Sequence, residues 1–355
     1  MKLFYFSLIT YLLFNCANAQ STGEFVADAP SDILINGNDL YFCEYNNGKI
    51  SKIDITDSTP VKTEILTGLS RPSGMAINGN DLYFSEIGDD NGDPDDGKIS
   101  KIDITDSSPI ITEVLTGLST PFSIAIQDQD LYFSESGDRS ISKIDITTIS
   151  PPPVLVSGLT SIPGGIILHN NDLYFCEYSS GKINKIDITD SSPVATEVIT
   201  GLTTPRNLAF DGNDLYFCEY SSDKISKIDI TEVSPTIIEI NTIAGAGPSS
   251  LAIKNSTIYV SELDNNKISF SNLSTLNVHN SSMQQKVKVF PNPANTYIEV
   301  SGLNKRKDYI IYNTLGVEKN NGIISNNGKI NIQNLANGMY LLKFDNKKPI
   351  KFIKE

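Results

Sequence analysis

The segment Asp39-Leu40-Tyr41-Phe42-Cys43-Glu44 returns around the chain with nearly the same letters. Four further copies and one diverged copy follow at intervals of 42, 49, 42, 42 and 43 residues, and they begin at Asp81, Asp130, Asp172, Asp214 and Thr257. Self-similarity at a period near 40 residues is typical of repeat proteins, in which each unit is a small sheet that cannot bury its faces alone. The sequence therefore predicts six equivalent units.

One complete unit runs from Gly68 to Thr116 and contains four strand-like segments. Gly and Pro residues mark the turns between them, and the segments are Met75–Ile77, Asp81–Glu86, Lys98–Ile104 and Ile110–Leu115. Four short strands per unit without helical periodicity are typical of a propeller blade. A superhelical β-solenoid is the alternative, but its coils are shorter. We predict an all-β protein built around a six-bladed β-propeller.

The second strand of the unit has no polar face. Leu82 and Phe84 alternate with Tyr83 and Ser85, so both faces are apolar or small, as expected for a sheet pressed between two others. The sixth unit lacks an obvious fourth strand. The segment Gly23–Ala27 precedes a proline loop as fourth strands do elsewhere, and we predict that it completes blade six and closes the ring.

The repeat also resembles known families. Tyr41-Phe42-Cys43-Glu44 followed by Lys49-Ile50-Ser51-Lys52-Ile53-Asp54 resembles the YWTD type of six-bladed propeller. The Gly-Leu-x-x-Pro segments before the first strands are similar to those of NHL repeats and the gluconolactonase-like group. Such propellers include lyases, lactonases and binding platforms, so the resemblance implies a fold and leaves the function open.

The chain begins with features of an export signal. Lys2 precedes the apolar segment Leu3–Phe14, and Ala17-Asn18-Ala19 forms a small-x-small cleavage site. We predict a signal peptide at residues 1–19, a propeller at 20–273 and a linker at 274–286. No later segment is long and apolar enough to span a membrane.

The last part of the chain, residues 287–355, has a different composition. It closely resembles the type A C-terminal sorting domain of the type IX (Por) secretion system of Bacteroidetes. Four landmarks carry the resemblance: Pro291-Asn292-Pro293, Tyr312-Asn313-Thr314-Leu315-Gly316, the segment Asn334–Tyr340, and the basic ending Lys351–Lys354. The resemblance implies that the secretion machinery is a partner and that the mature propeller is secreted or attached to the outer cell surface. A generic adhesive β-sandwich is the alternative.

Charge and cysteine usage narrow the function further. From residue 284 onward there are 12 Lys or Arg against five Asp or Glu, although the whole chain has a net charge of −14. The propeller is therefore strongly acidic, which argues against nucleic acid and anionic membranes as partners. Cys43, Cys176 and Cys218 occupy a slot that other repeats fill with Ser, which indicates small buried residues and no disulfide framework.

One acidic residue recurs at the end of every second strand: Glu44, Glu86, Glu135, Glu177, Glu219 and Glu262. Six carboxylates around a channel could gather Ca²⁺. A residue that is identical in every blade, however, usually serves the blade by accepting hydrogen bonds from a neighbouring loop or strand. We predict the structural role, which the resemblance to YWTD propellers also implies.

Binding residues are better sought where the copies differ. The proline loops, which lead into the first strand of each blade, carry Arg71, Ser73, Phe122, Arg206 and Asn207 at variable positions. Arg71 and Arg206 belong to blades two and five, which face each other across a six-fold ring. Guanidinium groups beside an aromatic ring suit an anionic or sugar-like ligand. Ordinary solvated loop residues are the alternative.

Blade two carries an acidic insertion between its second and third strands. Asp89, Asn91, Asp93 and Asp95 alternate along it and lie near Glu86, which suggests a Ca²⁺ site. Pro94 stands where an EF-hand needs Gly, and no Glu occupies the twelfth position, so the motif is not an EF-hand. Calcium is the candidate cofactor, and a solvated acidic loop is the alternative.

Catalytic groups are scarce in this sequence. There are two histidines, His169 at the end of a first strand and His279 beyond the repeats, and no Ser-His-Asp set or phosphate loop can be assembled. We therefore predict a non-catalytic extracellular propeller that binds or scaffolds a partner whose identity the sequence does not give. A lactonase- or lyase-like enzyme with a channel metal is the alternative.

Overall fold

The computed structural model describes residues 22–89, 95–148, 154–274, 276, 288–301, 303, 306–314, 316–325, 328–344 and 349–355. The predicted signal peptide lies outside these ranges. Within them the chain consists of β-strands, turns and one turn of 3-10 helix, η1 (Tyr220–Ser222). It divides into two compact units, Met1–Val278 and His279–Glu355. In the described part, no helix has the length and apolar character that crossing a membrane requires.

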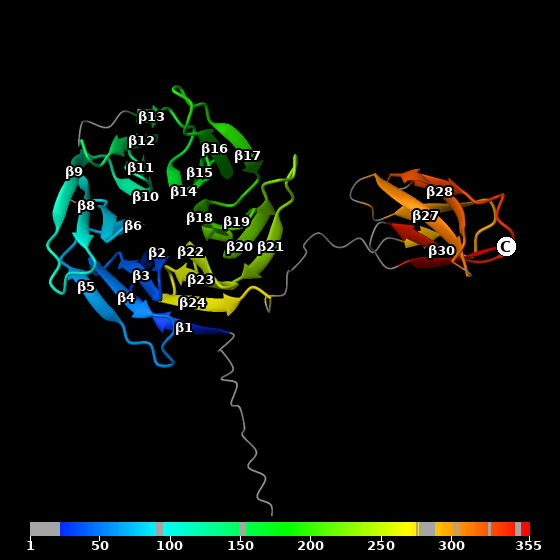
Figure 1. Cartoon of the computed structure of the whole chain (residues 1–355), viewed down its shortest axis with the longest axis horizontal. Helices are drawn as coiled ribbons and strands as arrows, with labels where there is room; N and C mark the ends of the chain where they lie inside the picture. Colours follow the sequence, from blue (N-terminus) through cyan, green and yellow to red (C-terminus); the bar gives the residue numbers. More distant parts are fainter. Residues whose placement is uncertain are drawn as a thin grey trace, which may run out of the picture. The chain divides into compact units, whose positions relative to one another are not determined.

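The first unit contains six four-stranded antiparallel sheets arranged as blades around a centre (Figure 1). Blades one to three are β2 (Pro30–Asn36), β3 (Asp39–Glu44), β4 (Lys49–Asp54) and β5 (Thr63–Thr67); β6 (Pro72–Asn78), β7 (Asp81–Glu86), β8 (Gly97–Asp103) and β9 (Thr112–Leu118); and β10 (Pro121–Gln127), β11 (Asp130–Glu135), β12 (Ser140–Asp145) and β13 (Val154–Val156). Blades four and five are β14 (Pro163–His169), β15 (Asp172–Glu177), β16 (Lys182–Asp187) and β17 (Thr196–Thr200); and β18 (Pro205–Asp211), β19 (Asp214–Glu219), β20 (Lys224–Asp229) and β21 (Ile238–Thr242). The prediction of a six-bladed propeller is confirmed.

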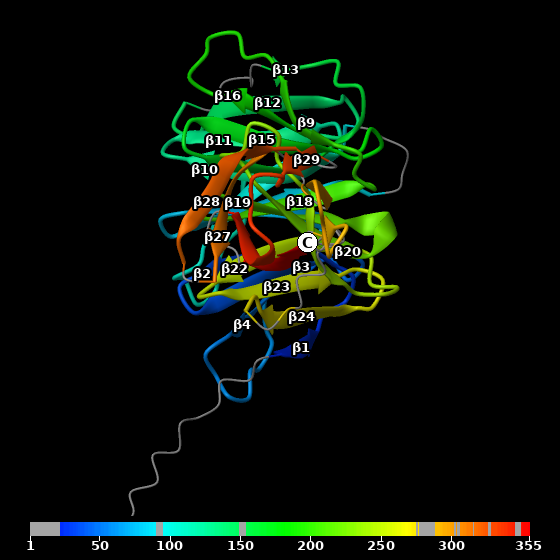
Figure 2. The same cartoon turned by 90° about the vertical axis from the view of Figure 1, so that its right-hand side faces the viewer.

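The sixth blade joins the two ends of the repeat array. It contains β22 (Pro248–Lys254), β23 (Thr257–Glu262) and β24 (Lys267–Asn272), and its fourth strand is β1 (Thr22–Val26) from the start of the described chain. β1 pairs antiparallel with β24, with Phe25 opposite Ile268, and Figures 1 and 2 both show the two strands side by side. The predicted N-terminal closure is confirmed, one residue earlier than expected.

Packing between blades explains why the second strand has no polar face. Leu82 and Phe84 pack toward blade one with Met75, whereas Tyr83 packs toward blade three with Ile124. One such apolar cluster fills each of the six blade–blade contacts. The three cysteines are free and fully buried in these layers, as their exchange with Ser predicted.

In blades one to five, the Asp that begins the second strand pairs with a Lys of the third strand, and this Lys also lies over a Tyr ring of the second strand. In blade one the Lys52 ammonium lies 2.7 Å from Asp39 Oδ2 and 5.7 Å from the centre of the Tyr41 ring. Blade six has Thr257 at the Asp position, and there Phe270 stacks on Phe25 of β1 instead, at 5.1 Å between ring centres. In the diverged sixth repeat, the stacking of Phe270 on Phe25 therefore replaces the Lys–Asp–Tyr contact of the other blades.

The first strands surround a central channel. Each pairs with the second strand of its blade, and the register shifts immediately after the proline, for example between Pro205 and Leu208. Such a bulge takes two residues out of the ladder and redirects their side chains. The channel has a volume of about 390 Å³ and is lined by residues of all six first strands, mostly aliphatic. The bulge residues lie at the end where the proline loops begin each strand, which we call the proline face.

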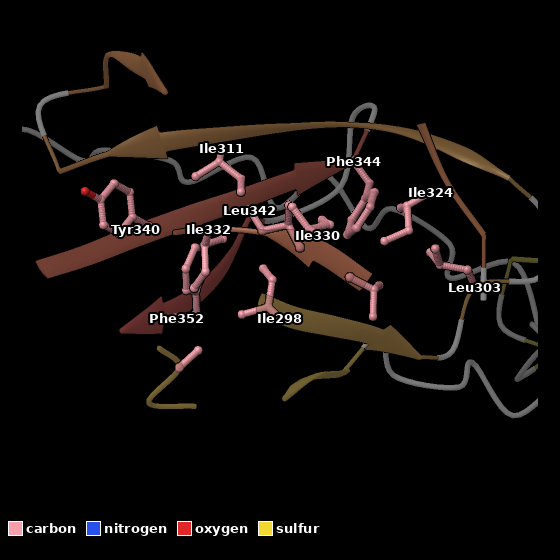
Figure 3. Packing of buried hydrophobic residues seen from close by; sticks show 12 residues of the cluster. Ile298, Leu303, Ile311, Ile324, Ile330, Ile332, Tyr340, Leu342, Phe344 and Phe352 are labelled. Carbon is pink, nitrogen blue, oxygen red and sulfur yellow. The ribbon is translucent and has the colours of Figure 1, made fainter. Parts of the chain in front are cut away.

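The second unit is a small two-sheet structure. One sheet contains β25 (Lys288–Phe290), β26 (Tyr297–Ser301) and β29 (Gly328–Asn331), and the other contains β28 (Glu318–Ile324), β27 (Lys307–Asn313), β30 (Gly338–Phe344) and β31 (Ile350–Lys354). Ile298, Ile311, Leu342 and Phe352 are fully buried between them (Figure 3). The sequence predicts a small basic β-sandwich here with strands at 297–300, 308–313, 329–332 and 338–344. The structure has these strands in two packed sheets and adds β25, β28 and β31.

Candidate ligand-binding site at the channel mouth

The residue that follows the proline distinguishes the two halves of the ring. In blades one, two and six it is Ser, and all three serines are buried. Ser31 Oγ donates a hydrogen bond to the Pro72 carbonyl (2.9 Å), and Ser249 Oγ donates one to the Ser31 carbonyl (2.8 Å). These serines join neighbouring blades. Ser73, which the sequence suggested as a ligand contact, is 2% exposed and belongs to this buried set.

In blades three, four and five the same slot holds Phe122, Gly164 and Arg206. The Arg206 guanidinium carbon lies 5.5 Å from the centre of the Phe122 ring and 4.9 Å from that of the Tyr220 ring. Blade four separates blades three and five. Gly164, which stands between them in the ring, contributes no side chain to this contact.

No hydrogen bond or ion pair joins the Arg206 side chain to another part of the described chain, and its Nε is buried without a hydrogen-bond partner. Burial lowers the pKa of this guanidinium, while the nearby Tyr178 and Tyr220 oppose the shift. Arginine nevertheless stays protonated in proteins because its ordinary pKa is so high. The half-buried Arg206 guanidinium therefore lies beside the Phe122 and Tyr220 rings, and its Nε has no hydrogen-bond partner.

A pocket of about 250 Å³ opens beside this cation. Its walls are formed by Phe122, Ser136, Ile162, Pro163, Gly164, Tyr178 and Arg206. These residues come from the proline loops of three consecutive blades and from the loops that follow their second strands. The pocket therefore forms only when blades three, four and five are packed together, because no single blade supplies all of its walls.

The tyrosines of this site were missed at the level of the sequence. Tyr178 and Tyr220 directly follow the repeat acids of blades four and five, and Tyr45 does so in blade one, whereas the other blades have Ile, Ser and Leu there. Tyr220 is positioned by its hydroxyl, which donates to Asp264 Oδ1 of blade six (3.1 Å). The same rule that singled out the proline loops, variation between equivalent slots, would have found these residues.

A polar cluster lines the channel at its proline-face end. Asp32 Oδ1 accepts hydrogen bonds from Ser250 Oγ (2.7 Å) and Asn207 Nδ2 (3.0 Å), and Asp32 Oδ2 accepts one from the Met75 amide (2.8 Å). Asn207, predicted as a ligand contact, is thus engaged with Asp32 and with Ser250. Asp32 itself was not singled out in the sequence. It occupies the slot two residues after the proline.

Burial raises the pKa of Asp32 to about 6, against the lowering effect of its hydrogen bonds from Ser250, Met75, Ile33 and Asn207. The cluster does not fit a resident cation, because both carboxylate oxygens face hydrogen-bond donors. The Asn207 carbonyl oxygen accepts the Leu208 amide (2.6 Å) and is occupied as well. Among the described residues, no group of three or more His, Cys, Asp or Glu side chains is placed to hold a metal.

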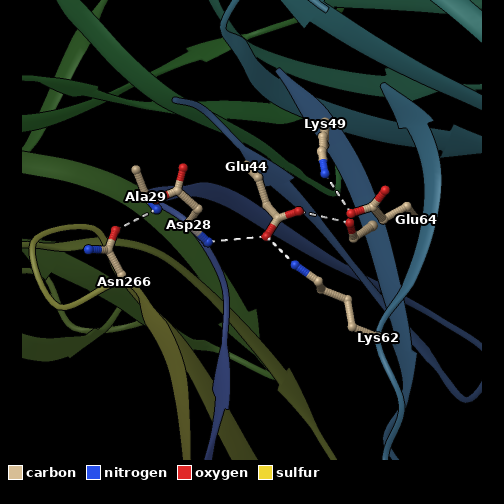
Figure 4. A network of polar contacts seen from close by, with 8 residues as sticks. Asp28, Ala29, Glu44, Lys49, Lys62, Glu64 and Asn266 are labelled. Atoms are coloured by element: carbon tan, nitrogen blue, oxygen red, sulfur yellow. Dashed lines mark hydrogen bonds and ion pairs between the residues drawn. The ribbon is translucent and has the colours of Figure 1, made fainter. Parts of the chain in front are cut away.

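The repeat acids make contacts of a structural kind. Glu44 is fully buried and accepts hydrogen bonds from the Asp28 amide (3.1 Å), Ser51 Oγ (3.0 Å) and Lys62 Nζ (2.8 Å). Figure 4 shows the contacts with Asp28 and Lys62. Burial acts to raise the pKa of Glu44, but the donors outweigh it and hold the pKa below its ordinary value. The corresponding acids accept from the Ser70, Ser119 and Thr203 amides and from the Thr160 and Asn265 side chains.

The remaining predicted residues lie apart from the pocket. Arg71 stands before its proline with φ +54° and donates from Nε to the Gly88 carbonyl (2.6 Å), so it braces the loop of its own blade. In the acidic insertion, Asp89 and Asp95 are described, whereas Asn91 and Asp93 lie outside the described residues. The Asp89 amide donates to Asp96 Oδ2 (2.7 Å). The calcium site proposed for this loop with Glu86 stays a prediction.

Residues 288–355 match the profile of the family described as the secretion system C-terminal sorting domain. This confirms the resemblance found in the tail and shows that this part of the chain is a sorting domain of the Por secretion type. No curated protein sequence is similar to the chain.

Solved structures share the propeller fold. A chain of the nidogen/laminin complex is 16% identical with a TM-score of 0.55, and the match covers 64% of this chain and 87% of that one. An auxiliary nutrient binding protein from Bacteroides thetaiotaomicron is 14% identical with a TM-score of 0.57, over 69% of each chain. Virginiamycin B lyase from Staphylococcus aureus is 21% identical with a TM-score of 0.50, over 70% of this chain and 98% of that one. At these identities the likeness extends to the fold alone.

Proposed function

We propose that the chain is exported by the type IX machinery through residues 287–355 and that its propeller binds a small anionic ligand outside the cell. The observation that carries the binding role is the Arg206 guanidinium, which has no ion-pair partner in the described chain, has an Nε without a hydrogen-bond partner, and lines an open pocket. A partly desolvated cation that has ring contacts but no anionic partner is stabilised further when a ligand supplies an anion. A purely structural arginine would normally hold a carboxylate or carbonyl of its own protein.

Binding is tested by calorimetric titration of the purified chain with a library of small acids, phosphates and glycans. A ligand that binds the wild type and is at least ten-fold weaker on Arg206→Gln supports the proposal. Arg71→Gln is the matched control, because Arg71 lies on the same face but outside the pocket. A library that gives only ligands indifferent to Arg206→Gln would contradict the proposal.

The alternative is a hydrolytic or lyase-like enzyme that works in the channel. Asp32 favours it, because a carboxyl group with a pKa of about 6 suits acid–base chemistry. The cluster around it does not fit the channel metal that this alternative invoked. Turnover of lactones or related substrates that is abolished by Asp32→Asn, Glu86→Gln or Arg206→Ala would favour the enzyme over the binding protein.

A further inference from the structure

The pocket beside Arg206 has walls that restrict its ligand to one chemical class, and this inference rests on the proposed binding function. The volume of about 250 Å³ lies below the roughly 300–1,000 Å³ of pockets that hold drug-sized molecules. The ligand is therefore a small molecule or one terminal group of a larger one. Nothing in the pocket walls other than Arg206 carries a formal charge.

The geometry of Arg206 favours a carboxylate. The guanidinium carbon lies 5.5 Å from the centre of the Phe122 ring and 4.9 Å from that of the Tyr220 ring, and no other part of the described chain forms an ion pair with it. The guanidinium N–H groups form a planar fork that pairs with two oxygens of one carboxylate.

The remaining walls favour an apolar body over a sugar. Besides Arg206, the polar side-chain atoms of the pocket are the hydroxyls of Ser136 and Tyr178. A monosaccharide carries several hydroxyl groups, and each one buried without a partner weakens binding. A flat apolar ring loses nothing in this way and gains contact with Phe122, Ile162 and Pro163.

We propose that this site binds a small hydrophobic monocarboxylate, with the carboxylate paired to Arg206 and an aromatic or apolar ring against Phe122 and Tyr178. Gly164 is a buried position in the wall of this pocket. A Cβ at this position would lie 3.0 Å from the Arg206 carbonyl oxygen and 3.4 Å from Cys176 Cβ, so any side chain would crowd the loop between the two.

The test uses calorimetric titration of the purified chain with benzoate and phenylacetate, and with benzamide and benzyl alcohol as neutral ligands of similar size. We expect the two acids to bind and the neutral compounds to bind at least ten-fold more weakly. Arg206→Gln should weaken the acids at least ten-fold. Gly164→Ser should weaken them as well, and its added side chain, which would crowd the Arg206 backbone, should also lower the melting temperature.

Two further arms separate the ligand class from the binding function. Glucose and inorganic phosphate are titrated against the same variants. If one of them binds in an Arg206-dependent manner and the aromatic acids do not, the ligand class is wrong and the binding function stands. If the acids bind equally well to Arg206→Gln, the proposed site is wrong. If no compound of the broad library depends on Arg206, both proposals are wrong.

Discussion

At the scale of single residues, equivalent slots of the six blades serve different purposes according to whether they vary. The slot after the second strand's Ser or Cys is always Glu, and that Glu accepts hydrogen bonds from its own blade and proline loop. The slot after the proline varies between a buried Ser and the set Phe122, Gly164 and Arg206. The position that is Glu in every blade stabilises the fold, whereas the variable position after the proline contributes Phe122, Gly164 and Arg206 to the candidate site.

Replacing a repeat acid should lower stability and leave the pocket unchanged. Glu44→Gln removes a carboxylate that is fully buried and holds Lys62, Ser51 and the Asp28 amide. We expect a loss of about 1–3 kcal/mol in the free energy of unfolding, measured by urea denaturation, because buried donors lose a charged acceptor. Affinity for any Arg206-dependent ligand should not change.

The matched control for this experiment is Glu64→Gln. Glu64 pairs with Lys49 at 2.6 Å, but its side chain is 44% exposed. Exposed ion pairs contribute little, so the change should stay within about 0.5 kcal/mol. Equal losses in the two variants would contradict a structural role specific to Glu44.

Asp32 makes the stability of the propeller depend on pH. Its pKa is about 6 in the folded chain, where burial dominates, against an ordinary value of 3.8. At Asp32 the folded state therefore binds a proton more tightly than the unfolded chain, and the contribution of Asp32 to the free energy of unfolding should fall as the pH rises from about 4 to 6. The shift corresponds to about 3 kcal/mol. Urea denaturation at several pH values, compared with Asp32→Asn, measures this contribution. Identical pH profiles for the two proteins would show that Asp32 does not supply it.

At the scale of elements, the strands are held by their neighbours more than by their own composition. β28 (Glu318–Ile324) contains Glu, Lys, two Asn and Gly, residues that disfavour strands. It forms because β27 offers a partner, with Asp308 opposite Ile323. β1 at the ring closure depends on its neighbour in the same way.

Substitutions to Ala on the two faces of β1 should have different effects on the free energy of unfolding. Phe25 stacks on Phe270, whereas the adjacent Val26 is 82% exposed. Phe25→Ala should lower the free energy of unfolding by about 2 kcal/mol, less than the 3–5 kcal/mol of a fully buried ring, because Phe25 is only partly buried. Val26→Ala should change it by less than about 0.5 kcal/mol.

Hydrogen exchange gives a second measurement of the closure. In Phe25→Ala, amides of β24 should lose protection before those of blade three, because β24 is the strand that pairs with β1. If protection fell equally in all blades, the closure would not be a local weak point of the ring.

At the scale of the whole molecule, the sorting domain and the proposed binding site belong to different units. Each has its own hydrophobic core, and the Por-type sorting domain begins at residue 288. The pocket lies entirely within the propeller unit. Changes in one unit should therefore leave the function of the other unit intact.

Removing residues 288–355 should abolish export in a bacterium that has the type IX machinery. We expect the truncated chain to stay inside the cell envelope, while the full chain reaches the surface or the medium, as measured by immunoblots of the separated fractions. The truncated propeller should still bind its ligand. Surface delivery of the truncated chain would show that export does not depend on this domain.

The sequence by itself determined the number of blades, the closing strand and the sorting domain. Repeat spacing, the two apolar faces of Asp81–Glu86 and the landmarks of residues 287–355 are local patterns, and each follows from the order of residues along a short segment. Such patterns can be recognised without knowing which distant residues are in contact. The prolines also marked the loops that carry Phe122 and Arg206.

Only the tertiary structure decided which loop residues meet. From sequence, Arg71 and Arg206 were paired by the symmetry of the ring, but Arg71 turns to Gly88 and Arg206 reaches Phe122. Asp32 and Asn207 lie 175 residues apart and form one hydrogen-bonded cluster. These contacts depend on the closure of the ring and on the length of the Arg206 side chain. They cannot be predicted from any one segment of the sequence, because they bring together blades that are distant along the chain.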